Sequence, residues 1–245
     1  MTTADSVPIG HRDGPPLYGR MMSAIHSGHS FGNGVRMLKL PLIFVEEALY
    51  AGAISQFYLL TRALEAALEK HQKDPMVAKV RKLGLVVTPG YESDLRELYG
   101  GADDWQERAE SECTRATRDY VSIVEGSEPV DLVAAAFILY GALVVGGGKQ
   151  TQAKVRKVFP GCTHALFDVG DDMKALRTEF KSTYTAIGKE WPEHFERLEA
   201  QAARFMSLNN TVVLSVKCWG RRATAVALGA AAVGVIVVAA FRRGA

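Results

Sequence analysis

The stretch VDLVAAAFILYGALVVGGGKQTQAKVRKVF, from Val130 to Phe159, decides the fold of this chain. We expect it to be helical, because apolar residues fill its first half and Glu128-Pro129 is a helix start signal. Gly141 and the run Gly146–Gly148 lie inside the stretch. Each glycine in a helix interior costs about 1 kcal/mol relative to alanine. The run therefore predicts either a bend where something flat approaches the backbone, or tight packing of another helix against small residues.

Helical patterns continue on both sides of this stretch. Residues 31–41 contain two glycines and end in Pro41, so we expect a loop with one helical turn there. No β-hairpin signal and no internal repeat is present. The sequence predicts an all-α single domain of about eight helices over residues 17–220, preceded by a flexible arm at residues 1–16. The expected helices span residues 17–31, 42–71, about 93–99, 105–124, 130–159, 171–190 and 192–217.

The C-terminal residues 221–245 have the composition of a membrane anchor. The 19 residues 223–241 carry no charge, and the pairs Arg221–Arg222 and Arg242–Arg243 enclose them. As a helix they would be about 28 Å long, close to the thickness of a bilayer's hydrocarbon core. The alternative is a buried core helix. An anchor that is translated last inserts after synthesis, so we expect the domain in the cytosol, at the endoplasmic reticulum or mitochondrial outer membrane.

Charge and cysteine content narrow the possible functions. Without the four arginines around residues 223–241, the chain has 25 basic and 27 acidic residues, a net charge of −2. No basic face indicates nucleic-acid binding. Cys113, Cys162 and Cys218 are odd in number and widely spaced, which favours reduced thiols and no zinc site.

Four side chains stand out as candidate ligands. His26 is a lone imidazole near the start of the fold, which suits the axial position of a haem, and His29 competes for the same role. Arg177 and Lys181 lie one helical turn apart and could hold carboxylates. Considered singly, the histidines could be surface or core residues, and the two cations could belong to a solvated helix face.

Together these segments resemble the haem oxygenase family. Leu132–Gly147 is similar to that family's distal haem helix, and AIHSGHS around His26 resembles its proximal helix. LRTEFKS around Arg177, LRELYG and AQAARFMSLNN resemble further segments in the same order. The resemblance covers roughly residues 17–216. It implies a haem-oxygenase-like multi-helix domain, and eukaryotic members also carry a C-terminal transmembrane helix.

The resemblance implies a role for each residue. His26 would be the axial ligand of the haem iron. Gly146 and Gly147 would lie across the opposite face and leave room for O₂, while Arg177 and Lys181 would hold the propionates. Haem would be both cofactor and substrate, cleaved to biliverdin, CO and iron with electrons from an NADPH-dependent reductase or another donor.

Several positions depart from the family pattern. The aspartate that orders water on the distal side falls on Leu143, and leucine cannot relay a proton. A protein that binds haem without turnover (a sensor, carrier or buffer) and a helical interaction scaffold are therefore alternatives. A di-iron oxidase, which the same fold also supports, is a further alternative that the lack of Glu-x-x-His spacing disfavours. The other departures are Leu139, Ala142 and Val145 on the distal helix, Phe137 in place of an aromatic hydroxyl at a propionate, and Ser30 in place of a carboxylate beside the axial histidine.

Overall fold

The computed structural model describes residues 15–220 and Thr224, and these residues are all-α. Most of the predicted arm, and the predicted anchor at 221–245 except Thr224, lie outside the described residues. Within the described part the chain forms ten α-helices and two short 3-10 helices. They are α1 Leu17–Ile43, α2 Glu47–Lys70, α3 Pro75–Arg81, α4 Thr88–Leu98, α5 Trp105–Ser111, α6 Arg115–Glu125, α7 Pro129–Val144, α8 Gly148–Val158, η1 Ala165–Phe167, α9 Met173–Glu190, η2 Pro192–His194 and α10 Phe195–Ser215.

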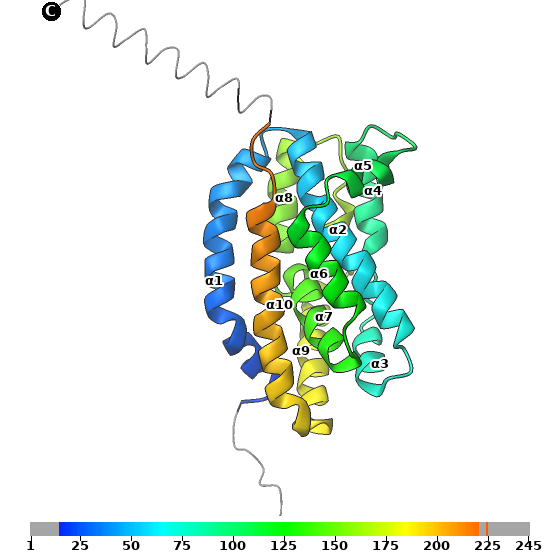
Figure 1. Cartoon of the computed structure of the whole chain (residues 1–245), viewed down its shortest axis with the longest axis vertical. Coiled ribbons are helices and arrows are strands. Elements are labelled where there is room, and N and C mark those ends of the chain that lie inside the picture. Colours follow the sequence, from blue (N-terminus) through cyan, green and yellow to red (C-terminus); the bar gives the residue numbers. More distant parts are fainter. Residues whose placement is uncertain (1–14, 221–223, 225–245) are drawn as a thin grey trace, which may run out of the picture.

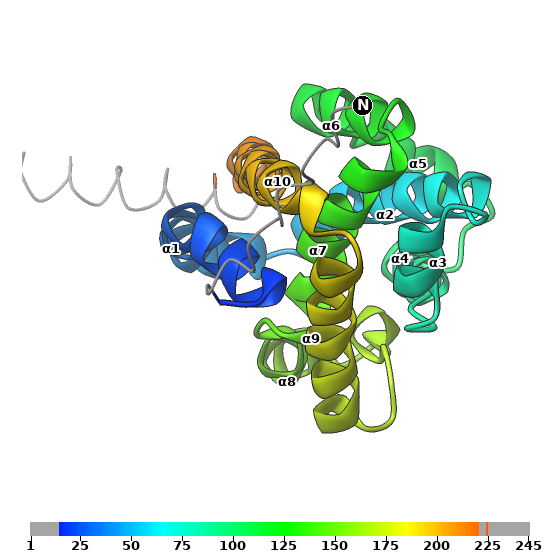
Figure 2. The ribbon, with the colours of Figure 1, turned by 90° about the horizontal axis from the view of Figure 1, so that it is seen from below.

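Helix α7 is the centre of the bundle. It is surrounded by α1, α10, α6, α2 and α9 when the molecule is viewed along its long axis (Figure 2). Twelve of its 16 residues are buried, and its polar residues are confined to its start. A helix that is apolar on all sides belongs inside a protein. The all-round apolar composition of residues 130–145 therefore explains why this helix takes the central position.

The predicted break near Phe31 is wrong, because α1 runs without interruption from Leu17 to Ile43 and includes Pro41 in its last turn. Of the two glycines that suggested a loop, Gly32 contacts α10, as Gly28 does one turn earlier, whereas Gly34 has no atom within 4 Å of an added Cβ. A Cβ atom added to Gly28 would lie 2.9 Å from Met206 Cγ, and one added to Gly32 would overlap the Asn210 amide. Gly28 and Gly32 allow α1 and α10 to approach closely.

Two other boundaries differ from the sequence prediction. The expected helix at 105–124 is divided into α5 and α6, because Thr114 caps α6. Its Oγ1 accepts a hydrogen bond from the Thr117 N–H at 3.2 Å, while its own N–H donates to Gln56 Oε1 at 3.0 Å. The helix expected near Ser93 begins earlier, at Thr88, where Pro89 occupies the first turn.

Within the described ranges, no helix taken singly has both the length and the hydropathy to span a membrane. Helices α7 and α8 meet these criteria only as a pair, and the pair is bent by 54°.

Candidate functional site

The bend between α7 and α8 confirms the prediction from the glycine run. The axes of the two helices change direction by 54° across residues 145–147. The N–H groups of Val145 and Gly146 both donate to the Gly141 carbonyl oxygen at 2.9 Å, so the last turn of α7 widens. A Cβ atom on Gly146 would lie 2.5 Å from the Ala142 carbonyl oxygen. The bend therefore requires glycine at this position.

Gly147 differs from the glycines on either side of it. A Cβ atom on Gly148 would lie 2.9 Å from the Leu143 carbonyl oxygen, so this residue is also constrained by the bend. Gly147 has φ −78° and ψ 25°, which other residues can adopt. An added Cβ atom there would meet only Gln150 Oε1, at 3.9 Å. Nothing in the described chain demands a glycine at 147, and its exposed backbone is open to a flat partner.

Helix α9 brings its two predicted cations to the bend and to α1. The Arg177 Nε donates a 2.8 Å hydrogen bond to the Val144 carbonyl oxygen, which lies at the end of α7. The Lys181 Nζ lies 5.8 Å from the centre of the Tyr18 ring on α1. Both cationic side chains are exposed. They lie one turn apart on the same helix, as the sequence predicted.

His26 lies on the exposed face of α1. The opposite face, with Leu17, Met21 and Ile25, is buried. Helical spacing places Met22 and Met37 on the same side as His26, and both are exposed, by 37% and 67%. No hydrogen bond to the His26 imidazole exists among the described residues. Its ring nitrogens are therefore available to a ligand from outside α1.

His29 is less available than His26. Its Nδ1 is paired with the Asn33 amide nitrogen at 3.3 Å, and Arg36 bonds the same amide through its oxygen. Partial burial lowers the pKa of His29, and the positive charge of Arg36 and the neighbouring His26 lower it further. A lowered pKa keeps the imidazole neutral, which is the form that binds a metal, so only the contact with Asn33 makes His29 less available than His26. The assignment of the axial position to His26 stays a prediction.

Three contacts with α10 fix α1 along its length. Arg20 forms an ion pair with Glu199 near the start of the helix. The Asn210 side-chain amide donates to the Gly28 carbonyl oxygen at 2.8 Å. Near the end, the Lys39 Nζ donates to the carbonyl oxygens of Val213 at 3.1 Å and Val216 at 2.6 Å. Only Asn210 of these partners lies in the segment AQAARFMSLNN, so the support for α1 extends along all of α10 and the residues that follow it.

Helix α9 contacts both α1 and α7 and so connects α1 with the bend. In Figure 2, α1 lies across α7 from α3, α4 and α5, and α8 lies below α7. Tyr18 on α1 packs edge-on against Phe137 on α7, with ring centres 5.8 Å apart. Phe137 is only 3% exposed, and its ring also contacts Phe180 and Tyr184. The resemblance also places Phe137 among the haem-binding residues, at the position of an aromatic hydroxyl near a propionate, and this role stays a prediction.

The distal positions that lack polar groups are interior positions of α7. Leu139 and Leu143 are 4% and 8% exposed. The carboxylate nearest in sequence after this segment is Asp168, which Lys149 binds at 2.6 Å and Gln152 at 2.9 Å. Hydrogen bonds from these two residues outweigh partial burial and lower the pKa of Asp168. Gln152 is buried, whereas the Lys149 and Asp168 side chains are 39% and 46% exposed, so this cluster lies at the surface edge of α8.

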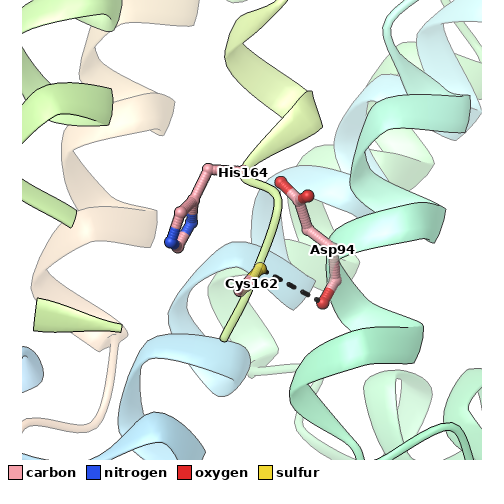
Figure 3. A group of neighbouring side chains, drawn as sticks. All are labelled: Asp94, Cys162 and His164. Carbon is pink, nitrogen blue, oxygen red and sulfur yellow. Dashed lines mark hydrogen bonds between the residues drawn. The ribbon is translucent and has the colours of Figure 1, made fainter. Parts of the chain in front are cut away.

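Sequence reasoning missed one group of polar residues. Asp94, Cys162 and His164 are all buried, and their donor atoms lie within 4.8 Å of one another. Figure 3 shows the His164 imidazole and the Asp94 carboxylate on opposite sides of the segment that carries Cys162. The cluster combines residues that are distant in sequence, so spacing gave no signal for it.

The members of this cluster hold the loop before η1. The Asp94 carboxylate accepts hydrogen bonds from the N–H groups of Ala165 at 2.6 Å and Leu166 at 3.0 Å. His164 adopts a left-handed conformation with φ 57°, and its Nε2 is 2.9 Å from the Phe159 carbonyl oxygen. Burial raises the pKa of the Cys162 thiol to about 12. These polar groups have hydrogen-bond partners within the chain, so the role of the cluster is to stabilise the loop before η1.

Known proteins with a similar sequence or fold are heme oxygenases. The model of the family described as "Heme oxygenase" matches residues 20–213. Heme oxygenase 1 of Nostoc sp. strain PCC 7120 is 25% identical over 173 residues, which cover 68% of this chain and 72% of that protein. The crystal structure of heme oxygenase 2 from Chlamydomonas reinhardtii without heme is 28% identical, with a TM-score of 0.76, and the match covers 84% of this chain and all of that one.

A more distant structure has the same fold. Heme oxygenase-1 from the cyanobacterium Synechocystis sp. PCC6803, in complex with heme, is 19% identical, with a TM-score of 0.70 over 93% of this chain and all of that chain. The family model spans most of the described helices, from α1 to α10. The family model and the fold agree, and the chain belongs to the heme oxygenase family.

Proposed function

We propose that this protein binds haem between α1 and the α7–α8 bend and cleaves it oxidatively to biliverdin, CO and iron. O₂ and electrons from an NADPH-dependent reductase, or from another donor, would be required. The solved relative from Synechocystis sp. PCC6803 is a complex with heme, which supports haem as the ligand of this fold. The proposal assigns the axial position to His26 and the opposite face to Gly146 and Gly147.

The observation that carries the proposal is the open backbone at Gly147. Gly146 and Gly148 are explained by the bend, but Gly147 is not. A macrocycle is flat, so it can approach within van der Waals contact of a backbone only where no side chain intervenes. The accessible imidazole of His26 on α1 supplies the kind of nitrogen that binds haem iron.

The chain's other residues would orient the macrocycle. With the Arg177 Nε already bonded to Val144, the terminal nitrogens of the guanidinium remain as donors for a carboxylate. Lys181, one turn along α9 and close to Tyr18, adds a second cation. When bound, haem would supply the iron centre at which O₂ is activated. The two cations would determine which edge of the ring points toward α7.

The apolar distal side favours slow turnover. Leu139 and Leu143 offer no donor or acceptor, and the described part of α7 after Asp131 contains no carboxylate. This observation supports a second candidate function, in which the protein binds haem as a sensor, carrier or buffer without degrading it.

The test uses the full chain in detergent micelles, mixed with hemin. An axial imidazole gives a sharp Soret band, which we expect for this protein and not for His26→Ala. Ascorbate or a reductase is then added under air, and biliverdin and CO are measured. Both products support the oxygenase. A stable Soret band without either product supports haem binding alone, and no Soret change excludes both functions.

We also propose that residues 223–241 anchor the domain in a membrane, with the domain in the cytosol. The basis is the uncharged sequence between two arginine pairs. The endoplasmic reticulum and the mitochondrial outer membrane both suit such an anchor. Expression of the full chain with a fluorescent N-terminal tag, followed by alkaline carbonate extraction, tests the proposal. A protein released into the soluble fraction by carbonate would contradict it.

A further inference from the structure

Four large apolar side chains are exposed at one end of the bundle. They are Leu38 on α1, Val45 after α1, Leu214 in the last turn of α10 and Trp219 beyond it, exposed by 77%, 40%, 49% and 62%. We call these residues the end patch. Single exposed apolar residues are common on protein surfaces, but a group of them marks an interaction site.

Contacts between α1 and α10 bring the members of the end patch to the same end. Lys39, the residue after Leu38, donates hydrogen bonds to the carbonyl oxygens of Leu214 and Val216. Gly220 lies against Glu46, since an added Cβ atom would be 2.6 Å from that carboxylate. Trp219 and Val45 are the neighbours of these two residues. Figure 1 shows the C-terminal ends of α1 and α10 at the same end of the molecule.

The sequence that follows the end patch identifies its partner. Arg221 and Arg222 come directly after Gly220, and the uncharged residues 223–241 come next. Lys217, within the same loop, is exposed. Tryptophan prefers the level of the lipid headgroups, and basic residues close to a membrane bind anionic headgroups. Exposed aliphatic residues, a tryptophan and adjacent cations suit the interfacial layer of a bilayer.

We propose that the end patch rests in the interfacial layer of an anionic lipid bilayer, so that the domain lies on the membrane with the ends of α1 and α10 toward it. The inference rests on the proposed anchoring by residues 223–241 and adds a defined orientation to it. Haem binding is not involved, because the end patch contains none of the residues assigned to the haem.

Tryptophan fluorescence provides the test. The chain has three tryptophans, of which Trp105 is 4% exposed and Trp219 is 62% exposed. The full chain is reconstituted into vesicles of phosphatidylcholine and phosphatidylserine whose acyl chains carry bromine near the headgroups. We expect the bromines to quench the emission of the wild-type protein at least twofold more than that of Trp219→Phe. Equal quenching in the two proteins would overturn the proposal.

Sedimentation separates failure of the anchor from failure of the end patch. If the full chain does not sediment with vesicles, both the anchoring and the end patch are wrong. If it sediments and Trp219 is not quenched by bromine, the anchoring stands and the end patch is wrong. Protection of Trp219 from acrylamide without lipid, increasing with protein concentration, would instead identify a second copy of the chain as the partner and overturn the proposal.

Substitutions in the end patch give an independent readout. The double substitution Leu38→Ser with Leu214→Ser should reduce the quenching of Trp219 by bromine at least twofold. Without these two apolar side chains, the end patch would enter the interfacial layer of the bilayer less deeply. The matched control is Val86→Ser with Val158→Ser, which changes two exposed apolar residues outside the end patch, 67% and 42% exposed. Equal quenching in both double variants would contradict the proposal.

Discussion

The Nε of Arg177 donates a 2.8 Å hydrogen bond to the carbonyl oxygen of Val144. Val144 is the last residue of α7, where the bend leaves backbone carbonyl groups without partners in the helix. A residue that the sequence indicated as a carboxylate ligand therefore also stabilises the bend. This bond therefore links the position of the Gly146–Gly147 backbone to the position of Arg177, the expected propionate donor.

Replacing Arg177 should affect the apoprotein as well as haem binding. Arg177→Gln should lower the free energy of unfolding by about 1 kcal/mol, because the Val144 carbonyl loses a charged donor. It should also weaken hemin binding by about tenfold, the equivalent of roughly 1.4 kcal/mol. Urea denaturation and hemin titration measure the two effects.

The control for Arg177 is Lys181→Gln on the same helix. The Lys181 side chain makes a cation–π contact with Tyr18 and, among the described residues, donates no hydrogen bond to a backbone carbonyl. We therefore expect Lys181→Gln to weaken hemin binding with the free energy of unfolding changed by less than about 0.5 kcal/mol. If Arg177→Gln left the apoprotein equally stable, the role assigned to the Val144 bond would be wrong.

Alanine substitutions at two glycines of the bend should distinguish an effect on the stability of the fold from an effect on hemin binding. Gly146→Ala should destabilise the apoprotein by about 1–3 kcal/mol, because its Cβ atom would lie 2.5 Å from the Ala142 carbonyl oxygen. Gly147→Ala should leave stability within about 0.5 kcal/mol or raise it slightly, since its backbone is permissive and its surroundings are open.

Hemin titration completes this comparison. Gly147→Ala should weaken hemin binding despite its unchanged stability, because the methyl group would stand between the backbone and the macrocycle. Thermal unfolding of the apoprotein and the Soret titration are measured on the same preparations. Unchanged hemin affinity in Gly147→Ala would contradict the placement of haem against this residue.

The sequence was sufficient to predict features that arise from local chemistry. The bend is one of the two outcomes that the glycine run predicted. The central place of α7 was not predicted, although its apolar composition accounts for it. The unbroken α1 could not be predicted, because Gly28 and Gly32 are accommodated by Met206 and Asn210, far away in sequence. The Asp94–Cys162–His164 cluster was missed for the same reason. Helical periodicity also gave no sign that Arg177 bonds the end of α7.

The two histidines of α1 should give different spectra when replaced. His26→Ala should remove the axial ligand and replace the sharp Soret band of the hemin complex with a broad, blue-shifted one. His29→Ala should retain the band, because His29 is already paired with Asn33. Imidazole added to His26→Ala should restore the spectrum. A normal band in His26→Ala with a lost band in His29→Ala would reverse the assignment.

The buried carboxylate of Asp94 should matter for stability. Asp94→Asn replaces one acceptor oxygen with an amide N–H₂, which would face a backbone donor of Ala165 or Leu166. We expect a loss of about 1–3 kcal/mol in the free energy of unfolding. Asp103→Asn, at an exposed position, is the matched control and should change it by less than about 0.5 kcal/mol. Chemical denaturation of the three proteins checks this difference.

Leu143→Asp tests whether the apolar distal side limits turnover. The carboxylate could order water near the haem face, so biliverdin formation should rise by about tenfold or more, within the range of general acid–base catalysis. Because Leu143 is 8% exposed, the variant should lose about 2–5 kcal/mol of stability, and its unfolding midpoint must be measured first. Leu143→Asn, which avoids the buried charge, is used if the aspartate variant does not fold.

The matched control for Leu143→Asp is Ala142→Asp. Ala142 is exposed beside the bend, so its carboxylate should be tolerated by the apoprotein. It adds the same charge one residue away from position 143 and should give no gain in biliverdin. A gain only at position 143 would mean that the missing proton relay limits the reaction. If Leu143→Asp and Leu143→Asn both fold, bind hemin and form no more biliverdin than the parent, haem binding without turnover becomes the better description of the protein, because the scaffold then lacks more than one polar group.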